Sequence, residues 1–220
     1  MSSGPFSKSF GQYFNYQAIK TFSISLLTNR QNFLPHLRAR SVYQVDFRKL
    51  HVQGIHHVIF DKDNTLTVPY SRHYHSEQIE QAVREAKEVF GECHVVVISN
   101  SVGSKDDKGY AEAKEVEDTL GVAVIRHVHK KPNVLKEVLD HFKCIEEDRV
   151  AVVGDRILAD VVMGNSFGFF TIYVDPLDIS QENFAVRLSR KFEDSFLPVI
   201  CPRKKQEHTL VKDTKELLRF

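Results

Sequence analysis

From residue 55 onward, short apolar runs alternate with segments whose apolar residues recur every three or four positions. The run "HVVVIS" at 94–99 is continuous and β-branched, which is typical of a parallel strand buried on both faces. In the segment 76–90 the apolar residues fall on one helical face, and Ser76 is placed to cap it. The pattern predicts strands at 55–60, 94–99, 122–126, 149–155 and 169–174, and helices at 76–90, 108–121, 131–143 and 156–168.

Five strands alternating with four helices predict an α/β fold, namely a doubly wound, Rossmann-like parallel sheet with helices on both faces. A chain of 220 residues with 42% hydrophobic residues is long enough for one sizeable core. A further helical pattern at 182–197 aligns Phe184, Leu188 and Phe192, and we expect this stripe to face the core.

The charges are unevenly distributed along a chain whose net charge is only +1, so the sequence predicts no nucleic-acid partner. Residues 1–45 contain five Lys or Arg and no Asp or Glu, which suggests either an organelle transit segment or a basic arm that associates with membranes. We therefore expect an N-terminal arm at 1–45, a catalytic domain at 46–200 and a peripheral, mildly basic tail at 201–220.

Polar residues gather where the predicted strands end. Because ligands of an open parallel sheet bind beyond the carboxyl ends of its strands, these residues are expected to share one site. They are Asp61 and Asp63 after the first strand, Ser99 and Asn100 after the second, Lys130 and Lys131 after the third, and Asp155 and Asp160 after the fourth. Any one of them alone would more often be an ordinary polar residue of a loop.

Together they match the requirements of phosphoryl transfer. Asp61 could attack phosphorus and form an aspartyl-phosphate, while Asp63 handles the proton of the leaving group. Carboxylates crowded in this way repel one another unless a cation joins them, so Asp61 and Asp155 suggest bound Mg²⁺. Ser99 would donate a hydrogen bond to the phosphoryl group, and a lysine would offset its charge.

The four groups resemble, in order, the motifs of the haloacid dehalogenase superfamily of aspartate-nucleophile phosphatases. They are "DKDNT" at 61–65, "VVVISN" at 95–100, "KKP" at 130–132 and "GDRILAD" at 154–160. The resemblance implies that Asp61 is the nucleophile and a metal ligand, and that Asp63 is the acid/base and holds the metal through its carbonyl. It implies further that Ser99 binds phosphate, Lys131 rather than Lys130 neutralises charge, Asp155 binds the metal and Asp160 supports it.

A narrower resemblance extends over residues 32–178. The stretches "NFLPH", "ISNS", "HKKP" and "DPL" are similar to those of the phosphatidylglycerophosphate phosphatases of mitochondria and plastids. This implies that the substrate is phosphatidylglycerophosphate and the product phosphatidylglycerol, a step toward cardiolipin. It also favours a mitochondrial location, peripheral on the matrix side of the inner membrane, with a plastid as the alternative.

The residues themselves give modest support for a lipid substrate. Only nine residues, 67–75, separate the first motif from the next helix, and 101–130 are used by one helix and one strand. No cap domain is therefore expected, and the open site would suit a phosphate presented at a membrane surface. Asn100 and Arg156 are candidate substrate contacts, Arg156 for a second phosphate. A phosphatase of a soluble or protein-borne phosphate monoester remains the alternative, and the sequence does not give the oligomeric state.

Overall fold

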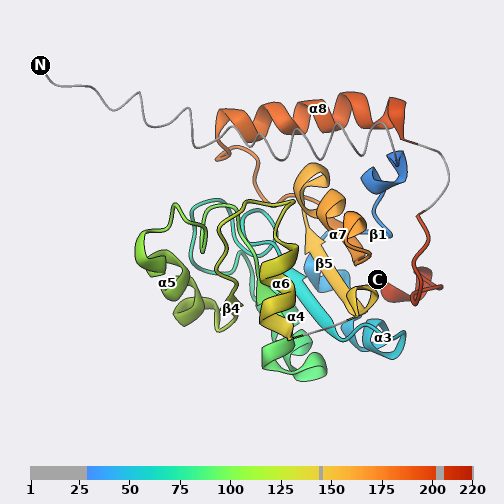
Figure 1. The fold of residues 1–220 in the computed structure, drawn as a ribbon, viewed down its shortest axis with the longest axis horizontal. Coiled ribbons are helices and arrows are strands. Elements are labelled where there is room, and N and C mark those ends of the chain that lie inside the picture. Colours follow the sequence, from blue (N-terminus) through green and yellow to red (C-terminus); the bar gives the residue numbers. More distant parts are fainter. Residues whose placement is uncertain (1–28, 144–145, 202–205, 220) are drawn as a thin grey trace, which may run out of the picture.

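The centre of this computed structural model is one sheet of six parallel strands in the order β1-β6-β5-β2-β3-β4 (Figure 1). The structure describes residues 29–143, 146–201 and 206–219. The strands are β1 (Leu37–Ala39), β2 (His57–Phe60), β3 (Val95–Val97), β4 (Ala123–Val124), β5 (Val150–Gly154) and β6 (Phe170–Val174). All five strands that the sequence predicts are present, and β1 is an addition.

Helices cover both faces of this sheet. They are α3 (Phe47–Val52), α4 (Glu77–Phe90), α5 (Ala111–Leu120), α6 (Leu135–Phe142), α7 (Val162–Ser166) and α8 (Phe184–Ile200). Successive residues of a strand point to opposite faces, so Val58 and Phe60 of β2 join the apolar cluster under α3, α4 and α5. Ile59 joins the second cluster, which includes residues of α6 and α7. The doubly wound α/β prediction is confirmed.

Short helical turns complete the connections. The 3₁₀ segments are Arg30–Phe33, Val42–Gln44, Glu92–His94, Lys108–Tyr110, Glu147–Arg149 and Lys215–Leu217. The helix expected at 156–168 begins as a π-helical turn, Ile157–Val161, before it continues as α7. The expected cap of α4 is present, because the Ser76 side chain accepts a hydrogen bond from the N–H of Ile79.

The expected boundary between arm and domain at residue 46 lies too far along the chain. Strand β1 pairs in parallel with β6, and Phe33 just before it is only 1% exposed. The side-chain amide of Asn165 donates to the carbonyls of Asn32 and Leu34, at 2.9 Å each. The arm from residue 29 onward therefore belongs to the fold, while residues 1–28 lie outside the described part.

The C-terminal segment is also more integrated than a peripheral tail. Val211 and Leu217 are buried in the apolar cluster on the α3–α5 face. The Arg219 guanidinium forms two hydrogen bonds of 2.6 Å with the Glu85 carboxylate of α4. Basic composition was a poor guide here because the buried apolar residues, not the charges, determine where the segment packs.

The apolar stripe expected to face the core along 182–197 points the other way. Phe184 is 80% exposed and Leu188 56% exposed, whereas Glu193 of the same helix is buried. A helical pattern shows which residues share a face but not which face meets the rest of the protein. In α8, the long helix across the top of Figure 1, Glu193 and the apolar Leu197 are the buried residues that face the domain.

The expected absence of a cap domain agrees with the connections after β2 and β3. Residues 61–76 form turns between β2 and α4, and residues between β3 and β4 contain only the Lys108–Tyr110 turn and α5. No domain is inserted at either place, both of which lie inside the described chain. Among the helices of the described residues, none has the length and apolar character needed to cross a bilayer.

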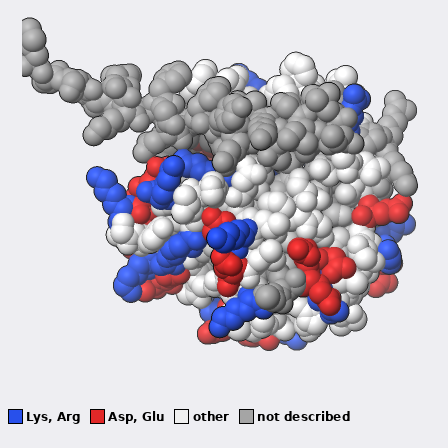
Figure 2. Space-filling view, viewed as in Figure 1, with Lys and Arg blue, Asp and Glu red and all other residues white. Residues whose placement is uncertain are grey.

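Charges on the surface are mixed in sign. Figure 2 shows basic and acidic side chains interspersed over the uncovered part of the visible face. Some of the surface charges pair, as in Arg72 with Glu115 at 2.5 Å and Lys114 with Asp118 at 3.5 Å. No broad field of one sign therefore covers the described residues on that face.

Candidate active site

The candidate site lies at the point in the sheet where the order in which strands are added reverses. From β2 the chain continues to β3 and β4 on one side, and β5 is then added on the other side of β2. The N–H of Asp61 donates to the carbonyl of Val153 at 2.8 Å, which places the ends of β2 and β5 side by side. This is the position at which open α/β sheets bind their ligands.

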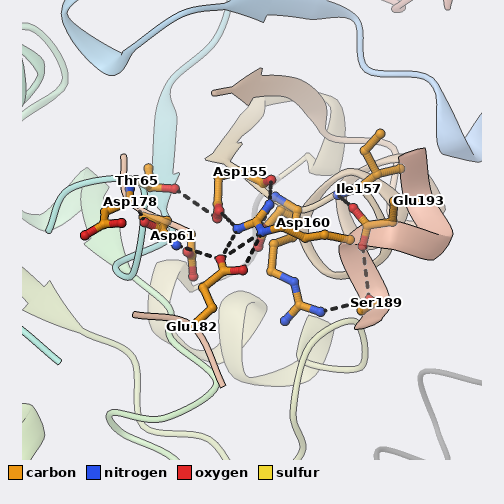
Figure 3. Close-up of polar contacts among 12 residues, drawn as sticks. Asp61, Thr65, Asp155, Ile157, Asp160, Asp178, Glu182, Ser189 and Glu193 are labelled. Atoms are coloured by element: carbon orange, nitrogen blue, oxygen red, sulfur yellow. Dashed lines mark hydrogen bonds and ion pairs between the residues drawn. The ribbon is translucent and has the colours of Figure 1, made fainter. Parts of the chain in front are cut away.

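Three carboxylates converge at this point. One oxygen each of Asp61, Asp155 and Asp160 lies within 4.8 Å of the others, and all three residues are buried (Figure 3). Burial raises the pKa of Asp61 to about 6 against the opposing effect of Lys131, and Asp160 adds to the rise. Burial and the nearby Asp61 carboxylate raise the pKa of Asp155 well above its usual range. Such a cluster strongly favours a cation.

Glycine at position 154 allows this convergence. A Cβ atom added to Gly154 would lie 2.4 Å from Cγ of Asp160, a separation that would force the carboxylate away. Asp160 is held there by its own turn, because its carboxylate accepts the N–H of Arg156 at 3.2 Å. The close approach explains why the "GDRILAD" stretch begins with glycine.

The structure distinguishes between the two candidate lysines. Nζ of Lys131 contacts the carboxylate of Asp61 and lies 2.6 Å from that of Asp160. Burial opposes the charge of Lys131, but Asp160 and Asp61 outweigh that effect and raise its pKa. Nζ of Lys130 instead pairs with Asp106 at 2.8 Å. Lys131 is therefore the lysine at the site.

Asn100 supports Lys131 from the neighbouring strand end. Its side-chain oxygen accepts the N–H of Lys131 at 2.7 Å, so it orients the backbone that carries the lysine. Contact between Asn100 and substrate stays a prediction. Arg156 donates to the Ser189 hydroxyl of α8 at 3.2 Å, and its role in binding a second phosphate likewise stays a prediction.

Asp63 lies on the more open side of the site, with about a third of its side chain exposed. Its two carboxylate oxygens accept hydrogen bonds from Lys62 at 2.7 Å and from the Ser101 hydroxyl at 3.0 Å. The Ser101 hydroxyl is in turn 2.9 Å from that of Ser99. Asp63 and Ser99 are thus linked through one intermediate hydroxyl, and neither Lys62 nor Ser101 was singled out from the sequence.

A second cation reaches the carboxylates from α8. Arg190 forms an ion pair with Asp155 and donates to the Asp155 carbonyl at 3.0 Å. Its Nε lies 2.8 Å from the carboxylate of Glu182, which also accepts from the side chain of Asn64 at 2.6 Å (Figure 3). Residues 182 and 190 belong to no recognised motif and lie far along the chain from residue 61, so sequence reasoning had no signal for them.

The carboxylate cluster has the donor set of a site for a hard divalent cation. Magnesium prefers oxygen ligands and commonly takes one or two protein carboxylates together with waters. Asp61, Asp155 and Asp160 supply buried carboxylate oxygens at mutually short distances. The residues therefore fit the expected Mg²⁺.

The raised pKa of Asp61 predicts a pH dependence of stability in the metal-free protein. The folded state keeps the Asp61 proton up to about pH 6, whereas the ordinary pKa is 3.8. Between these values the folded state binds more protons than the unfolded chain, so this group lowers the free energy of unfolding as pH rises. The favourable contribution of Asp61 to the free energy of unfolding is fully present below pH 3.8 and is lost by about pH 6. Urea unfolding across this interval should show a more negative slope for the wild type than for Asp61→Asn, and parallel slopes would contradict the assignment.

Comparison with known proteins places the chain in a family. A family model described as "Mitochondrial PGP phosphatase" matches residues 17–178. Phosphatidylglycerophosphate phosphatase 1, chloroplastic/mitochondrial, of Arabidopsis thaliana is 35% identical over 95% of this chain and 60% of its own length. Phosphatidylglycerophosphatase GEP4, mitochondrial, of Saccharomyces cerevisiae is 32% identical over 68% of this chain and 84% of its own length.

A bacterial protein is also similar. The probable phosphatase YqeG of Bacillus subtilis is 27% identical over 76% of this chain and 91% of its own length. The present chain spans only 60% of the Arabidopsis protein, so that relative contains sequence that has no counterpart in the match.

Proposed function

Because this chain belongs to the mitochondrial PGP phosphatase family, we propose that it hydrolyses the phosphate monoester of phosphatidylglycerophosphate to give phosphatidylglycerol. The observation that carries this proposal is the buried cluster of Asp61, Asp155 and Asp160, joined by Lys131, at the switch point of the sheet. The cluster supplies a nucleophile, a metal site and a fixed positive charge, as phosphoryl transfer requires.

In the proposed reaction, a carboxylate oxygen of Asp61 attacks phosphorus while the bond from phosphorus to the glycerol oxygen breaks. Asp63, on the more open side, donates its proton to that leaving oxygen. Water then attacks the phosphorus of the aspartyl-phosphate, Asp63 takes the proton, and inorganic phosphate leaves with Asp61 regenerated. Lys131 holds the Asp61 carboxylate in place and offsets charge on the phosphoryl group.

The acidic residues of the site would hold Mg²⁺ in this scheme. Asp61, Asp155 and Asp160 supply carboxylate oxygens, and the backbone carbonyl of Asp63 is a further ligand that the family resemblance implies. When bound, the ion supplies positive charge that stabilises the non-bridging phosphate oxygens. In its absence Lys131 and Arg190 partly balance the same carboxylates.

Two features support a substrate presented at a membrane. No domain is inserted after β2 or after β3 within the described chain, so no cap covers the site from either connection. Relatives carry names that assign them to mitochondria or chloroplasts and to a phospholipid substrate. We accordingly propose peripheral association with the matrix side of the mitochondrial inner membrane, with the product used toward cardiolipin.

A substrate panel tests this function. With Mg²⁺ present, the purified chain should hydrolyse short-chain phosphatidylglycerophosphate in preference to glycerol phosphate, nucleotides and phosphopeptides. Removal of Mg²⁺ with a chelator should abolish the activity. Strong preference for any soluble ester or phosphopeptide would replace the lipid substrate with the alternative of a soluble or protein-borne phosphate monoester.

A further inference from the structure

Exposed apolar side chains concentrate on one part of the molecule. Among the described residues, nine large hydrophobic side chains are exposed, and five of them lie between residues 179 and 199. These five are Ile179, Phe184, Leu188, Phe196 and Val199. Isolated exposed apolar residues are ordinary, but a set collected on one element usually marks a contact surface.

The orientation of α8 is the reverse of that expected for a surface helix. At 3.6 residues per turn, Phe184, Leu188, Phe196 and Val199 fall within one sector, which we call the outer stripe. Polar residues occupy the inner side: Glu193 accepts the N–H of Ile157 at 3.1 Å, and Ser189 accepts from Arg156. The helix thus binds the domain through these polar contacts and through Leu197, which is buried, and it leaves most of its large apolar residues outside.

Basic residues flank the outer stripe. Arg187 and Lys191 are exposed and lie one turn apart on one side of it. Of the two acidic residues in α8, Glu193 is turned inward and buried, and Asp194 is exposed. An apolar stripe beside Lys and Arg is the composition of helices that lie in the interface of anionic lipid bilayers.

The helix that carries the outer stripe also contacts the catalytic cluster through Arg190. Arg190 lies on the inner side of α8 and pairs with Asp155, which follows β5. The outer stripe and Arg190 thus belong to one helix and lie on opposite sides of it. A lipid surface bound by the stripe would therefore hold the catalytic domain next to its headgroups.

We propose that the outer stripe of α8, with Arg187 and Lys191, docks on an anionic lipid surface and so holds the catalytic domain next to the headgroup phosphates of that surface. The proposal rests on the proposed function, because it identifies the face through which a lipid substrate would be met. It assigns the membrane contact to α8, whereas the sequence alone suggested that the N-terminal arm makes this contact.

Vesicle binding without substrate tests the docking surface in the chain of residues 1–220. We expect wild-type protein to co-sediment with vesicles of phosphatidylcholine and phosphatidylglycerol and to bind phosphatidylcholine vesicles less strongly. The double variant Phe184→Ser, Leu188→Ser should bind the mixed vesicles at least about tenfold more weakly. The matched control is Tyr43→Ser, Val52→Ser, which removes two exposed apolar residues from another part of the surface and should bind as wild type does.

Three outcomes would contradict the assignment of the outer stripe as the docking surface. These are absence of wild-type binding, equal binding by wild type and the stripe variant, and loss of binding in the control as well. A change from oligomer to monomer in the stripe variant, seen by light scattering with vesicle binding kept, would assign the stripe to a second copy. Loss of binding on removal of residues 1–28, with the stripe variant unaffected, would assign the contact to the arm.

The same proteins separate this inference from the proposed function. If the stripe variant loses vesicle binding but wild type does not hydrolyse phosphatidylglycerophosphate, the docking surface stands and the substrate assignment fails. If both proteins hydrolyse short-chain substrate equally and bind vesicles equally, the function stands and the docking surface fails.

Discussion

Replacing Asp61 by Asn is expected to reduce turnover by at least about a thousandfold and to prevent formation of a phosphorylated enzyme. The substitution keeps the size of the side chain but replaces the attacking carboxylate oxygen with a neutral amide. The measurement is steady-state hydrolysis with Mg²⁺, together with mass spectrometry of protein quenched during turnover. Thermal unfolding of the variant establishes that the domain still folds.

Asp63→Asn is the matched control, because it removes a carboxylate two residues away without removing the proposed nucleophile. With an ester whose leaving group needs no proton, such as nitrophenyl phosphate, Asp63→Asn should still become phosphorylated. It should then release phosphate slowly, since Asp63 is the base for the attacking water. Activity of Asp61→Asn within a few-fold of wild type, or phosphorylation of that variant, would remove Asp61 from the nucleophile role.

The local pattern of the chain was sufficient for five of the six strands and for the meeting of four of the expected site residues. Asp61, Lys131, Asp155 and Asp160 meet because parallel strands place their carboxyl ends at one edge, a rule that needs only strand order. The adjacent lysines were harder to separate. Only the contact of Nζ with Asp61 and Asp160 distinguishes Lys131 from Lys130, which pairs with Asp106.

Other features depend on tertiary contacts that no local pattern contains. Strand β1 has three residues, too few to produce a periodic signal, and it is defined by pairing with β6. Arg190 and Glu182 reach the site only because α8 packs across the end of β5. The same packing turns the apolar residues of α8 outward, since its polar residues satisfy the N–H groups of Ile157 and Leu158.

Lys131→Met should cost both activity and stability, because it leaves Asp61 and Asp160 buried without the ammonium group between them. Removal of one partner from a buried ion pair commonly costs about 3–5 kcal/mol, and we expect a loss of about 3 kcal/mol in the free energy of unfolding at neutral pH without metal. Loss of the positive charge also raises the pKa of Asp61 further, since Lys131 lowers it in the wild type. Chemical unfolding and phosphatase assays measure the two effects.

Magnesium should restore part of the stability of Lys131→Met and little of its activity. A cation that binds the folded carboxylates stabilises the fold by mass action, and the variant has more uncompensated charge for it to balance. The shift in melting temperature on adding Mg²⁺ should therefore be larger for Lys131→Met than for wild type.

Lys130→Met is the matched control for the stability measurement. Its Nζ pairs with the part-exposed Asp106, so its loss should cost at most about 1 kcal/mol. A larger loss in Lys130→Met than in Lys131→Met would reverse the assignment of the two lysines. An equal response of all three proteins to Mg²⁺ would show that the ion does not bind the carboxylates that Lys131 joins.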